Sequence, residues 1–362
     1  MHLAKQSTRP FSSTQLIEDA DVLPVRAGLV VWDAWPIQSV DGGPLTVARD
    51  MELWMALGAP RSDDPDARHG CARIHLLLRH GQRWRDLGPA MPDGFSPGSR
   101  EWSGTAVIDP DGKALTLYFT AAGRRDENSL TFEQRIFAAN AFLEHDQEAW
   151  CLSGWGALRE ILPIDPALYM PTTGGGGAVG TIKAFRDPAF FRDPADGQNY
   201  LLFAGSRANS ASNYNGVVGI ARARPGVAAG WELLEPIVSA DCLNNELERP
   251  HVIVHGGLYY LFWSTQRHVF DPSGPTGPTG LYGMVSSRLT QGWEPLNGTG
   301  LVFANPEAAP AQAYSWWVLP DLSVTSFVDD WGGGDARRFG GAFAPFVRLG
   351  LDGARAWLEG QT

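Results

Sequence analysis

Apolar residues along this chain gather in short runs, and residues that favour tight turns separate the runs. The clearest runs are rich in Val, Ile, Leu, Phe, Tyr and Trp, and Gly, Pro, Asp or Asn bound them, as is typical of β-strands. They span residues 28–35, 71–80, 114–121, 199–206, 216–223, 250–265, 280–287, 322–330 and 343–349. The pattern predicts an all-β fold.

Two parts of the chain depart from this pattern. Residues 130–143 have mixed periodicity, so the sequence leaves both a helix and a strand open there. The first two dozen residues are polar and interrupted by proline. We expect residues 1–24 to form an arm laid over a single domain of residues 25–362.

Composition supports many short strands joined by tight turns. The 362 residues include 42 Gly, 26 Pro and 14 Trp, while charged residues make up only 19%. This composition suits an all-β domain whose cleft is lined by aromatic side chains better than it suits a helical bundle. Length does not decide the number of domains, because all-β domains of this size occur as single units.

The net charge narrows the class of ligand. At a formal charge of −11 the chain lacks the basic surface that nucleic-acid binding requires, so a neutral or small polar ligand fits better. Residues 1–16 contain no apolar signal segment, and no apolar run is long enough to span a membrane. We therefore expect no contact with membranes, and either a cytoplasmic location or export by a leaderless route.

The three cysteines predict neither a disulfide framework nor a zinc ribbon. Cys71, Cys151 and Cys242 are odd in number and irregularly spaced. We expect them to be buried free thiols.

Glu246 and Glu248 are the strongest candidates for chemistry. Two carboxylates two residues apart at the edge of a strand point to the same face, where like charges raise one another's pKa. One of them is then protonated near neutral pH, which is what the leaving oxygen of a glycosidic bond requires. Such an acid works with a second, ionised carboxylate opposite it.

Asp33 is one candidate for that opposite carboxylate. It lies between Trp32 and Trp35, so a regular strand would put the carboxylate on one face and both indoles on the other, unless a bulge re-aims one. An indole beside a carboxylate suits a stacked sugar ring. The alternative, that both tryptophans are core and Asp33 caps a turn, is equally consistent with this segment alone.

A repeated Arg-Asp-Pro triplet supplies further carboxylates. Asp187 follows Arg186, and Asp193 follows Arg192. An adjacent arginine lowers the pKa of an aspartate, so either one is a candidate fixed anion. Turn-forming residues follow Asp193, so we assign the second copy to a solvated loop and the first to the site.

Other motifs carry less information. Trp102 and Ser103 suit a sugar platform with a hydroxyl partner, or equally a buried tryptophan at a strand start. Residues 271–280 are too long for a hairpin turn and suit a loop at the rim of a site. A formal GxGxxG at 175–180 lacks a following helix, no HExxH occurs, and Ser103 is not in a GxSxG elbow.

Taken in order, the segments VWDAWP, EWSG, FRDP, ELERPH and AYSWWVLPDLSVTSFVDD resemble glycoside hydrolase family 68, the levansucrases, inulosucrases and bacterial β-fructofuranosidases. The resemblance runs from about Val25 to Val347. It implies a five-bladed β-propeller with the active site in a central axial funnel, and sucrose and sugar acceptors as partners. Radial closure of such a fold hides most strand edges.

The resemblance also implies roles for individual residues. Asp33 matches the nucleophile, Asp187 the transition-state stabiliser and Glu248 the general acid/base of a retaining enzyme that forms a covalent fructosyl-enzyme. The remaining matches are predicted substrate-binding positions: Trp32, Trp102, Ser103, Arg186, Glu246, Arg249, Gln266 and Tyr314.

Two departures from the family pattern refine this prediction. Asn245 stands where Gram-positive members have a calcium-binding aspartate, so we expect neither a metal nor a cofactor. Gln266 stands where the family usually has an Arg or a His that binds the acceptor. This favours sucrose hydrolysis and short fructo-oligosaccharides over long-chain levan. An inverting five-bladed glycosidase and a catalytically silent sugar-binding propeller remain as alternatives, and the sequence does not set the oligomeric state.

Overall fold

Strands dominate the protein. The structure is a computed structural model that describes residues 11–146, 149–172, 182–225, 230–332 and 337–360. Within these residues the helices are short 3-10 turns, η1 (Asp19–Asp21), η2 (Pro65–Gly70), η3 (Arg267–Val269) and η4 (Leu296–Gly298). None of the described helices is long and apolar enough to cross a membrane.

The strands form five consecutive antiparallel groups. The first holds β1 (Leu29–Gln38), β2 (Thr46–Ala48), β3 (Met51–Pro60), β4 (Arg73–His80) and β5 (Arg83–Pro89); the second holds β6 (Arg100–Ile108), β7 (Ala114–Ala122), β8 (Gln134–His145) and β9 (Trp150–Leu162). The third holds β10 (Phe185–Arg192), β11 (Asn199–Ser206), β12 (Gly216–Ala223), β13 (Trp231–Leu233) and β14 (Val238–Ser239). The fourth holds β15 (Glu248–His255), β16 (Leu258–Thr265), β17 (Gly280–Ser286), β18 (Glu294–Pro295) and β19 (Leu301–Ala304), and the fifth β20 (Ala313–Val318), β21 (Ser323–Val328), β22 (Val347–Asp352) and β23 (Arg355–Leu358).

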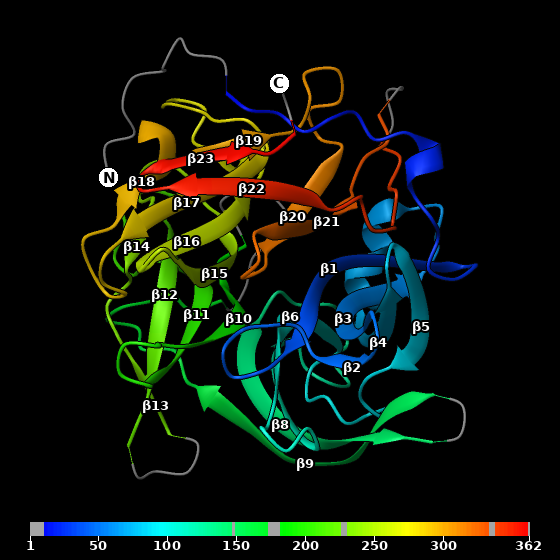
Figure 1. The fold of residues 1–362 in the computed structure, drawn as a ribbon. Coiled ribbons are helices and arrows are strands. Elements are labelled where there is room, and N and C mark those ends of the chain that lie inside the picture. The colour runs from blue at the N-terminus through cyan, green and yellow to red at the C-terminus, as the bar shows by residue number, and fades with distance from the viewer. Residues whose placement is uncertain (1–10, 147–148, 173–181, 226–229, 333–336, 361–362) are drawn as a thin grey trace.

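These groups are the blades of a closed propeller. In Figure 1 the first strand of each blade, β1, β6, β10, β15 or β20, lies near the centre, and the later strands lie toward the outside. Parallel pairing of Ile37 with Ala106 joins the first two blades into one nine-stranded sheet. The ring closes where the Val31 amide donates to the Gly341 carbonyl at 3.0 Å and where β1 contacts β20 and β21. The predicted five-bladed β-propeller is therefore confirmed.

The core lies between the blades. Trp35, Trp54 and Trp316 are among its largest fully buried side chains. Each large aromatic ring buries much apolar surface, so a few such side chains contribute a large part of the hydrophobic stabilisation of this core.

Most of the predicted runs coincide with strands, and the open question at residues 130–143 is resolved. Residues 134–145 form β8, which pairs with β7 on one side and β9 on the other. Pairing on both edges leaves no room for a helix. The glycine motif at 175–180 lies outside the described residues.

The cysteine prediction was half right. All three thiols are free, but Cys71 and Cys242 are exposed and Cys151 is partly exposed. Cys71 ends η2, and Cys242 lies in a turn with φ of 64°, so both are carried by surface turns and not by core strands.

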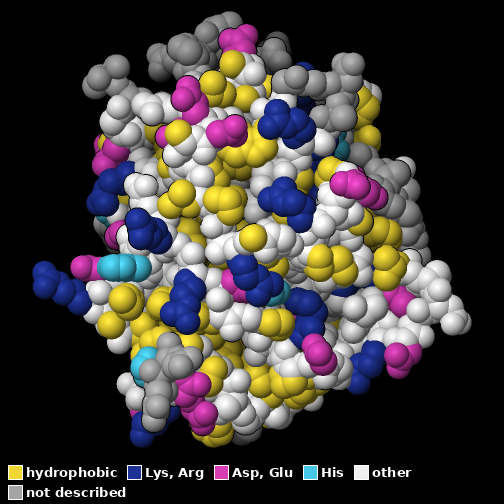
Figure 2. All heavy atoms as spheres, turned by 90° about the vertical axis from the view of Figure 1, so that its right-hand side faces the viewer, with side chains coloured by type: hydrophobic (Ala, Val, Ile, Leu, Met, Phe, Trp, Pro, Cys, Tyr) yellow, Lys and Arg dark blue, Asp and Glu magenta, His cyan; other side chains and the backbone are white. Residues whose placement is uncertain are grey.

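The segment before β1 crosses the junction of the fourth and fifth blades. The Thr14 amide donates to the Ala304 carbonyl at 2.9 Å, and the Gln312 side chain bonds both main-chain polar groups of Ile17. Figure 2 shows one outer face, where Lys and Arg side chains are interspersed with Asp and Glu. Basic and acidic side chains are mixed among the described residues of that face, and no uniformly basic patch that would bind nucleic acid is visible there (Figure 2).

Candidate active site

The inner strand of every blade has a shift of register where its side chains reach the central funnel. The shifts lie between Trp32 and Trp35, Trp102 and Gly104, Arg186 and Ala189, Glu248 and His251, and Tyr314 and Trp317. A bulge re-aims a side chain away from the regular alternation. In this way five distant motifs of the sequence contribute to one cavity of about 580 Å³.

The backbone at these bulges adopts conformations that are costly for residues other than glycine. Asp33, Asp187, Arg249 and Ser315 have φ values of 51°, 61°, 51° and 60°. Each left-handed residue costs about 1 kcal/mol or more and persists only where its surroundings hold it. At the β6 bulge the chains approach so closely that a Cβ on Gly104 would lie 2.0 Å from the Tyr118 carbonyl oxygen.

The β1 bulge separates the two tryptophans that flank the candidate nucleophile. Trp32 lines the funnel beside Asp33, while Trp35 is fully buried in the core. The sequence left open whether these tryptophans contact the ligand or belong to the core. Trp32 lines the funnel and Trp35 belongs to the core, so each interpretation holds for one of them. Asp33 Oδ2 accepts a hydrogen bond of 2.6 Å from Ser103 Oγ, which fixes the carboxylate.

Asp187 is held from several sides in a buried position. Its amide donates to Thr120 Oγ1 at 2.9 Å, and its Oδ2 accepts a bond of 3.3 Å from the Arg249 amide. Burial, with the negative charges of Glu248 and Asp33, raises the pKa of Asp187 to about 7 despite the nearby Arg186 guanidinium. Arg186 does lower this pKa, as predicted, but desolvation and the two nearby carboxylates outweigh it, so Asp187 is not the simple fixed anion that the sequence indicated.

The pair Glu246 and Glu248 lies on one face, as predicted, because Leu247 between them turns into the core. Arg186 Nη2 lies 2.8 Å from Glu248 Oε1 and 3.4 Å from Glu246 Oε2. The Tyr314 hydroxyl donates to Glu248 Oε2. Tyr314 remains a donor because burial and the charge of Glu248 hold its pKa well above the ordinary value.

The two glutamates differ in proton affinity. Burial and the charge of Glu248 raise the pKa of Glu246 to about 7, although Arg186 opposes the shift. Burial also acts on Glu248, but the charge of Arg186 and the hydrogen bonds from Tyr314 and Arg186 outweigh it and lower its pKa. In the free protein, the proton that this pair holds near neutral pH therefore resides on Glu246, next to Glu248.

Arg249 lies behind the carboxylates. Its Nη1 donates to Ser315 Oγ at 2.8 Å and its Nη2 to the Ala34 carbonyl at 2.7 Å, and the residue is only 2% exposed. These bonds tie β15 to β20 and β1. The structure thus places the guanidinium of this predicted substrate-binding residue in contact with three inner strands.

Trp102 and Gln266 also line the funnel. Trp102 lines the cavity and is partly buried, with the Arg100 guanidinium 5.5 Å from its ring. Gln266 lines it together with Thr279, whose hydroxyl accepts a bond of 3.0 Å from the Arg267 amide. The predicted loop 271–280 therefore does end at the rim of the funnel.

The second Arg-Asp-Pro triplet does lead into an exposed turn, as predicted, but its aspartate is not solvated. Asp193 is only 6% exposed, and its Oδ1 accepts a bond of 2.7 Å from the Tyr259 hydroxyl of the next blade. The turn residues after it are exposed, but the carboxylate points back between two blades. The assignment of Asp187 alone to the funnel agrees with the structure.

Sequence reasoning missed Lys183 completely. Its ammonium donates to the Asn213 carbonyl at 2.7 Å, to Asn215 Oδ1 at 3.0 Å and to Asn245 Oδ1 at 3.1 Å. It thereby ties three segments together directly before Glu246. No motif surrounds Lys183 in the sequence. The only hint of a polar contact in this region was the pair of adjacent asparagines, Asn244 and Asn245, before Glu246.

A network of four charged residues at the rim was also missed. Arg337 Nη1 lies 2.9 Å from Asp66 Oδ1 and also pairs with Asp329, while Arg68 lies 3.3 Å from Asp66. The neighbouring His69 is neutral, because burial and the charge of Arg68 lower its pKa to about 3. These partners are up to 271 positions apart in the sequence, so no local pattern could pair them.

Comparisons with known proteins identify relatives of this chain. The family model described as Levansucrase/Invertase matches residues 4–214 and 206–360. A levansucrase of Rahnella aquatilis is 31% identical over 96% of this chain and 90% of its own length. The structure of an inulosucrase from Halalkalicoccus jeotgali bound to kestose is 34% identical, with a TM-score of 0.89 over 99% of this chain and 93% of that one. The catalytic domain of a Microbacterium saccharophilum β-fructofuranosidase is 27% identical, with a TM-score of 0.83 over 97% of this chain and 85% of that one.

Proposed function

This chain belongs to the levansucrase/invertase family, glycoside hydrolase family 68, and we propose that it cleaves sucrose with retention, through a covalent fructosyl-enzyme. One observation carries the proposal. Asp33, Asp187 and Glu248 come from the inner strands of three different blades and line one funnel, with partners that hold each carboxylate in place. The chain is a sucrose-acting enzyme of this family, and the retaining mechanism and the preference for hydrolysis and short products are our proposal.

In the first step the Asp33 carboxylate attacks the anomeric carbon of the fructosyl unit. The bond to the bridging oxygen breaks, and Glu248 gives that oxygen its proton, so that glucose leaves and an ester to Asp33 remains. The hydrogen bond from Ser103 keeps Asp33 oriented for attack. Trp32 beside it provides an apolar face for the sugar ring.

Glu246 supplies the proton that Glu248 needs. The free protein favours the proton on Glu246 and the charge on Glu248, which Arg186 and Tyr314 stabilise. A bound glucosyl unit that draws on these donors weakens their hold on Glu248, and the proton then moves between adjacent carboxylates. The two groups titrate as one pair that carries a single proton.

Asp187 responds to the charge of the transition state. Its pKa is near 7 in the free site, and an oxocarbenium-like fructosyl group beside it lowers that pKa, because opposite charges favour ionisation. The ionised form then stabilises the transition state more than the ground state, as efficient catalysis requires.

In the second step, the oxygen of water or of a sugar hydroxyl attacks the anomeric carbon, the bond from that carbon to Asp33 breaks and frees the carboxylate, and Glu248 takes up the acceptor's proton. Both acceptors compete for one intermediate, so groups at the mouth of the funnel set the ratio of hydrolysis to transfer. Gln266 provides a neutral amide there. We propose that hydrolysis and short fructo-oligosaccharides predominate over long-chain levan.

Glu248→Gln tests the mechanism most directly. We expect glucose release from sucrose to fall by at least about a thousandfold, since loss of a general acid also leaves the base of the second step missing. The exposed Glu294→Gln is the matched control and should retain wild-type activity. Wild-type turnover in Glu248→Gln would exclude the acid/base role, and no glucose release by the wild-type protein would favour a silent sugar-binding propeller.

Product analysis separates the remaining alternatives. Incubation with concentrated sucrose, followed by separation of glucose, fructose and oligosaccharides, measures the partition between water and sugar acceptors. Abundant high-mass fructan would overturn the preference for short products. Methanol as acceptor should yield the β-fructoside, whereas the inverted anomer would contradict a covalent intermediate.

A further inference from the structure

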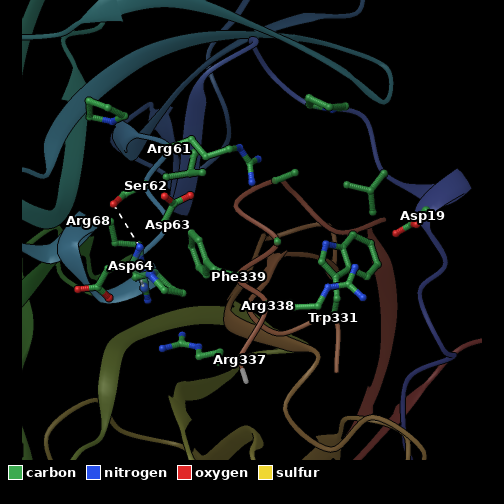
Figure 3. A pocket seen from close by; sticks show the side chains of 17 residues that line it. Asp19, Arg61, Ser62, Asp63, Asp64, Arg68, Trp331, Arg337, Arg338 and Phe339 are labelled. Carbon is green, nitrogen blue, oxygen red and sulfur yellow. Dashed lines mark hydrogen bonds between the residues drawn. The ribbon is translucent and has the colours of Figure 1, made fainter. Parts of the chain in front are cut away.

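A second cavity lies beside the funnel and has no part in the mechanism above. It has a volume of about 590 Å³ and lies between η1, the loop that follows β3, and the segment 337–342. Figure 3 shows Arg61 and Phe339 on one side of it and Trp331 and Arg338 on the other. Arg68 and Arg337 line both this side cavity and the funnel.

The wall between the two cavities is a thin packed layer. The Arg68 guanidinium lies 3.9 Å from the centre of the Phe339 ring and 5.6 Å from that of Trp32. The Phe339 ring meets Trp32 edge to face, with centroids 6.3 Å apart. The side cavity is therefore separated from the tryptophan beside the nucleophile by one guanidinium and one ring.

The lining of the side cavity offers unused donors and acceptors in equal measure. The side chains of Arg61, Arg338, Asp19 and Asp63 form no hydrogen bond or ion pair with any other described residue. The lining as a whole carries four arginines and three aspartates, and two of the arginines, Arg68 and Arg337, are already paired with Asp66 and Asp329, so no strong excess of positive charge favours an anion. Free polar groups of both kinds, next to the rings of Trp331 and Phe339, suit a neutral ligand with many hydroxyl groups.

We infer that the side cavity binds the distal sugar units of a fructo-oligosaccharide acceptor whose reacting hydroxyl lies in the funnel. The inference rests on the proposed function, since only a transferase needs an acceptor. Arg68 and Arg337 line both cavities, so an acceptor that runs over these two side chains contacts both, whereas a single hexose or sucrose in the funnel contacts one. Occupation of the side cavity raises the effective concentration of the acceptor hydroxyl at the fructosyl-enzyme. A fructo-tetrasaccharide is then a better acceptor than a disaccharide.

Trp331→Ala and Arg338→Ala test the inference, because both residues line the side cavity and neither lines the funnel. Their matched controls are the exposed Trp357→Ala and Arg49→Ala. We expect transfer to a labelled fructo-tetrasaccharide to fall at least about fivefold in the two test variants. Transfer to a labelled disaccharide and sucrose cleavage without added acceptor should stay within about twofold of wild type.

Direct titration keeps the inference testable even if sucrose is not the substrate. The fructo-tetrasaccharide and inorganic phosphate are each titrated into the full chain blocked from turnover by Glu248→Gln, with and without Trp331→Ala. Weaker tetrasaccharide binding in the double variant supports the inference. Unchanged tetrasaccharide binding and transfer in both test variants would overturn it, as would binding of phosphate alone. Failure of the wild-type protein to release glucose would defeat the proposed function, while this titration still reads the side cavity.

Discussion

Replacement of Glu246 by glutamine tests whether this residue stores the proton that Glu248 donates. The pair must hold one proton for the first step, and it holds that proton below the pKa of about 7 that burial gives Glu246. The amide introduced by Glu246→Gln holds no such proton. Glu248 must then be protonated on its own, and Arg186 and Tyr314 lower its pKa below the ordinary value of 4.5.

The expected shift is large. Activity is present while the proton is bound and is lost as pH rises, so this group sets the alkaline limb of the kcat/KM profile for sucrose. In the wild-type protein the limb falls near pH 7, and in Glu246→Gln it should fall below about pH 5. A displacement of two or more pH units corresponds to about 3 kcal/mol of proton affinity. At pH 6.5 the variant should lose at least about tenfold more activity than at pH 4.5.

Initial rates of glucose release between pH 4 and 8 measure the profile, with thermal unfolding as a check on folding. Glu246→Asp is the conservative variant, and because it restores a carboxylate it should restore part of the alkaline range. A uniform rise in KM across the whole pH range, with the alkaline limb unmoved, would refute the reasoning. Glu246 would then contact the sugar without supplying a proton.

Three further outcomes follow from contacts away from the carboxylate pair. Lys183→Met removes a cation near Glu246 and the three hydrogen bonds that Lys183 donates to the segments around Asn245, so kcat should fall about tenfold. Loss of the cation raises the pKa of Glu246, so the alkaline limb of the pH profile should move to higher pH, opposite to its movement in Glu246→Gln. An unmoved limb would contradict the electrostatic part of this role. Ala157→Gly should stabilise the protein by roughly 0.5 to 1 kcal/mol in denaturant unfolding, because the exposed Ala157 has a φ of 49°. The control Ala48→Gly should destabilise it, because Ala48 is exposed on β2 and has no positive φ to relieve. Tyr259→Phe should cost about 1 to 2 kcal/mol of unfolding free energy, because it leaves the buried Asp193 without its bond from the next blade; equal stability of the two proteins would show that water replaces that bond.

Local patterns in the sequence were enough to predict most of the strands and to single out the carboxylates of the funnel, whereas Arg249, Gln266 and Tyr314 came from the family resemblance and Arg68 and Arg337 were missed. Alternation and turn residues identify most of β1, β4, β7, β11 and β12, because each strand carries its own signal. The funnel residues carry a signal as well, since carboxylates next to tryptophan, arginine or a second carboxylate are unusual in strands. Their common location followed from the resemblance to a family and not from spacing, because Asp33 and Glu248 lie on different blades.

The parts that could not be predicted depend on long-range geometry. The β1 bulge decides which of Trp32 and Trp35 enters the funnel, and neighbouring residues alone do not position it. The pKa of Asp187 depends on how deeply the ring buries it, and an adjacent arginine gives no measure of that depth. Asp193 was misplaced for the same reason, since its partner Tyr259 belongs to another blade.

The repeated bulges of the inner strands have a consequence for how activity is lost. Each of the three proposed catalytic carboxylates, Asp33, Asp187 and Glu248, is carried by a separate blade, so no single blade holds a complete site, however well it is folded. The relative position of Asp33 and Glu248 depends on the seam where Val31 meets Gly341 and on the bonds from Arg249 to β1 and β20. Opening that seam would disperse the three carboxylates while most strand pairs stay intact. Loss of activity would therefore detect opening of the ring between the first and last blades, whereas loss of strand content would detect unfolding of the blades themselves.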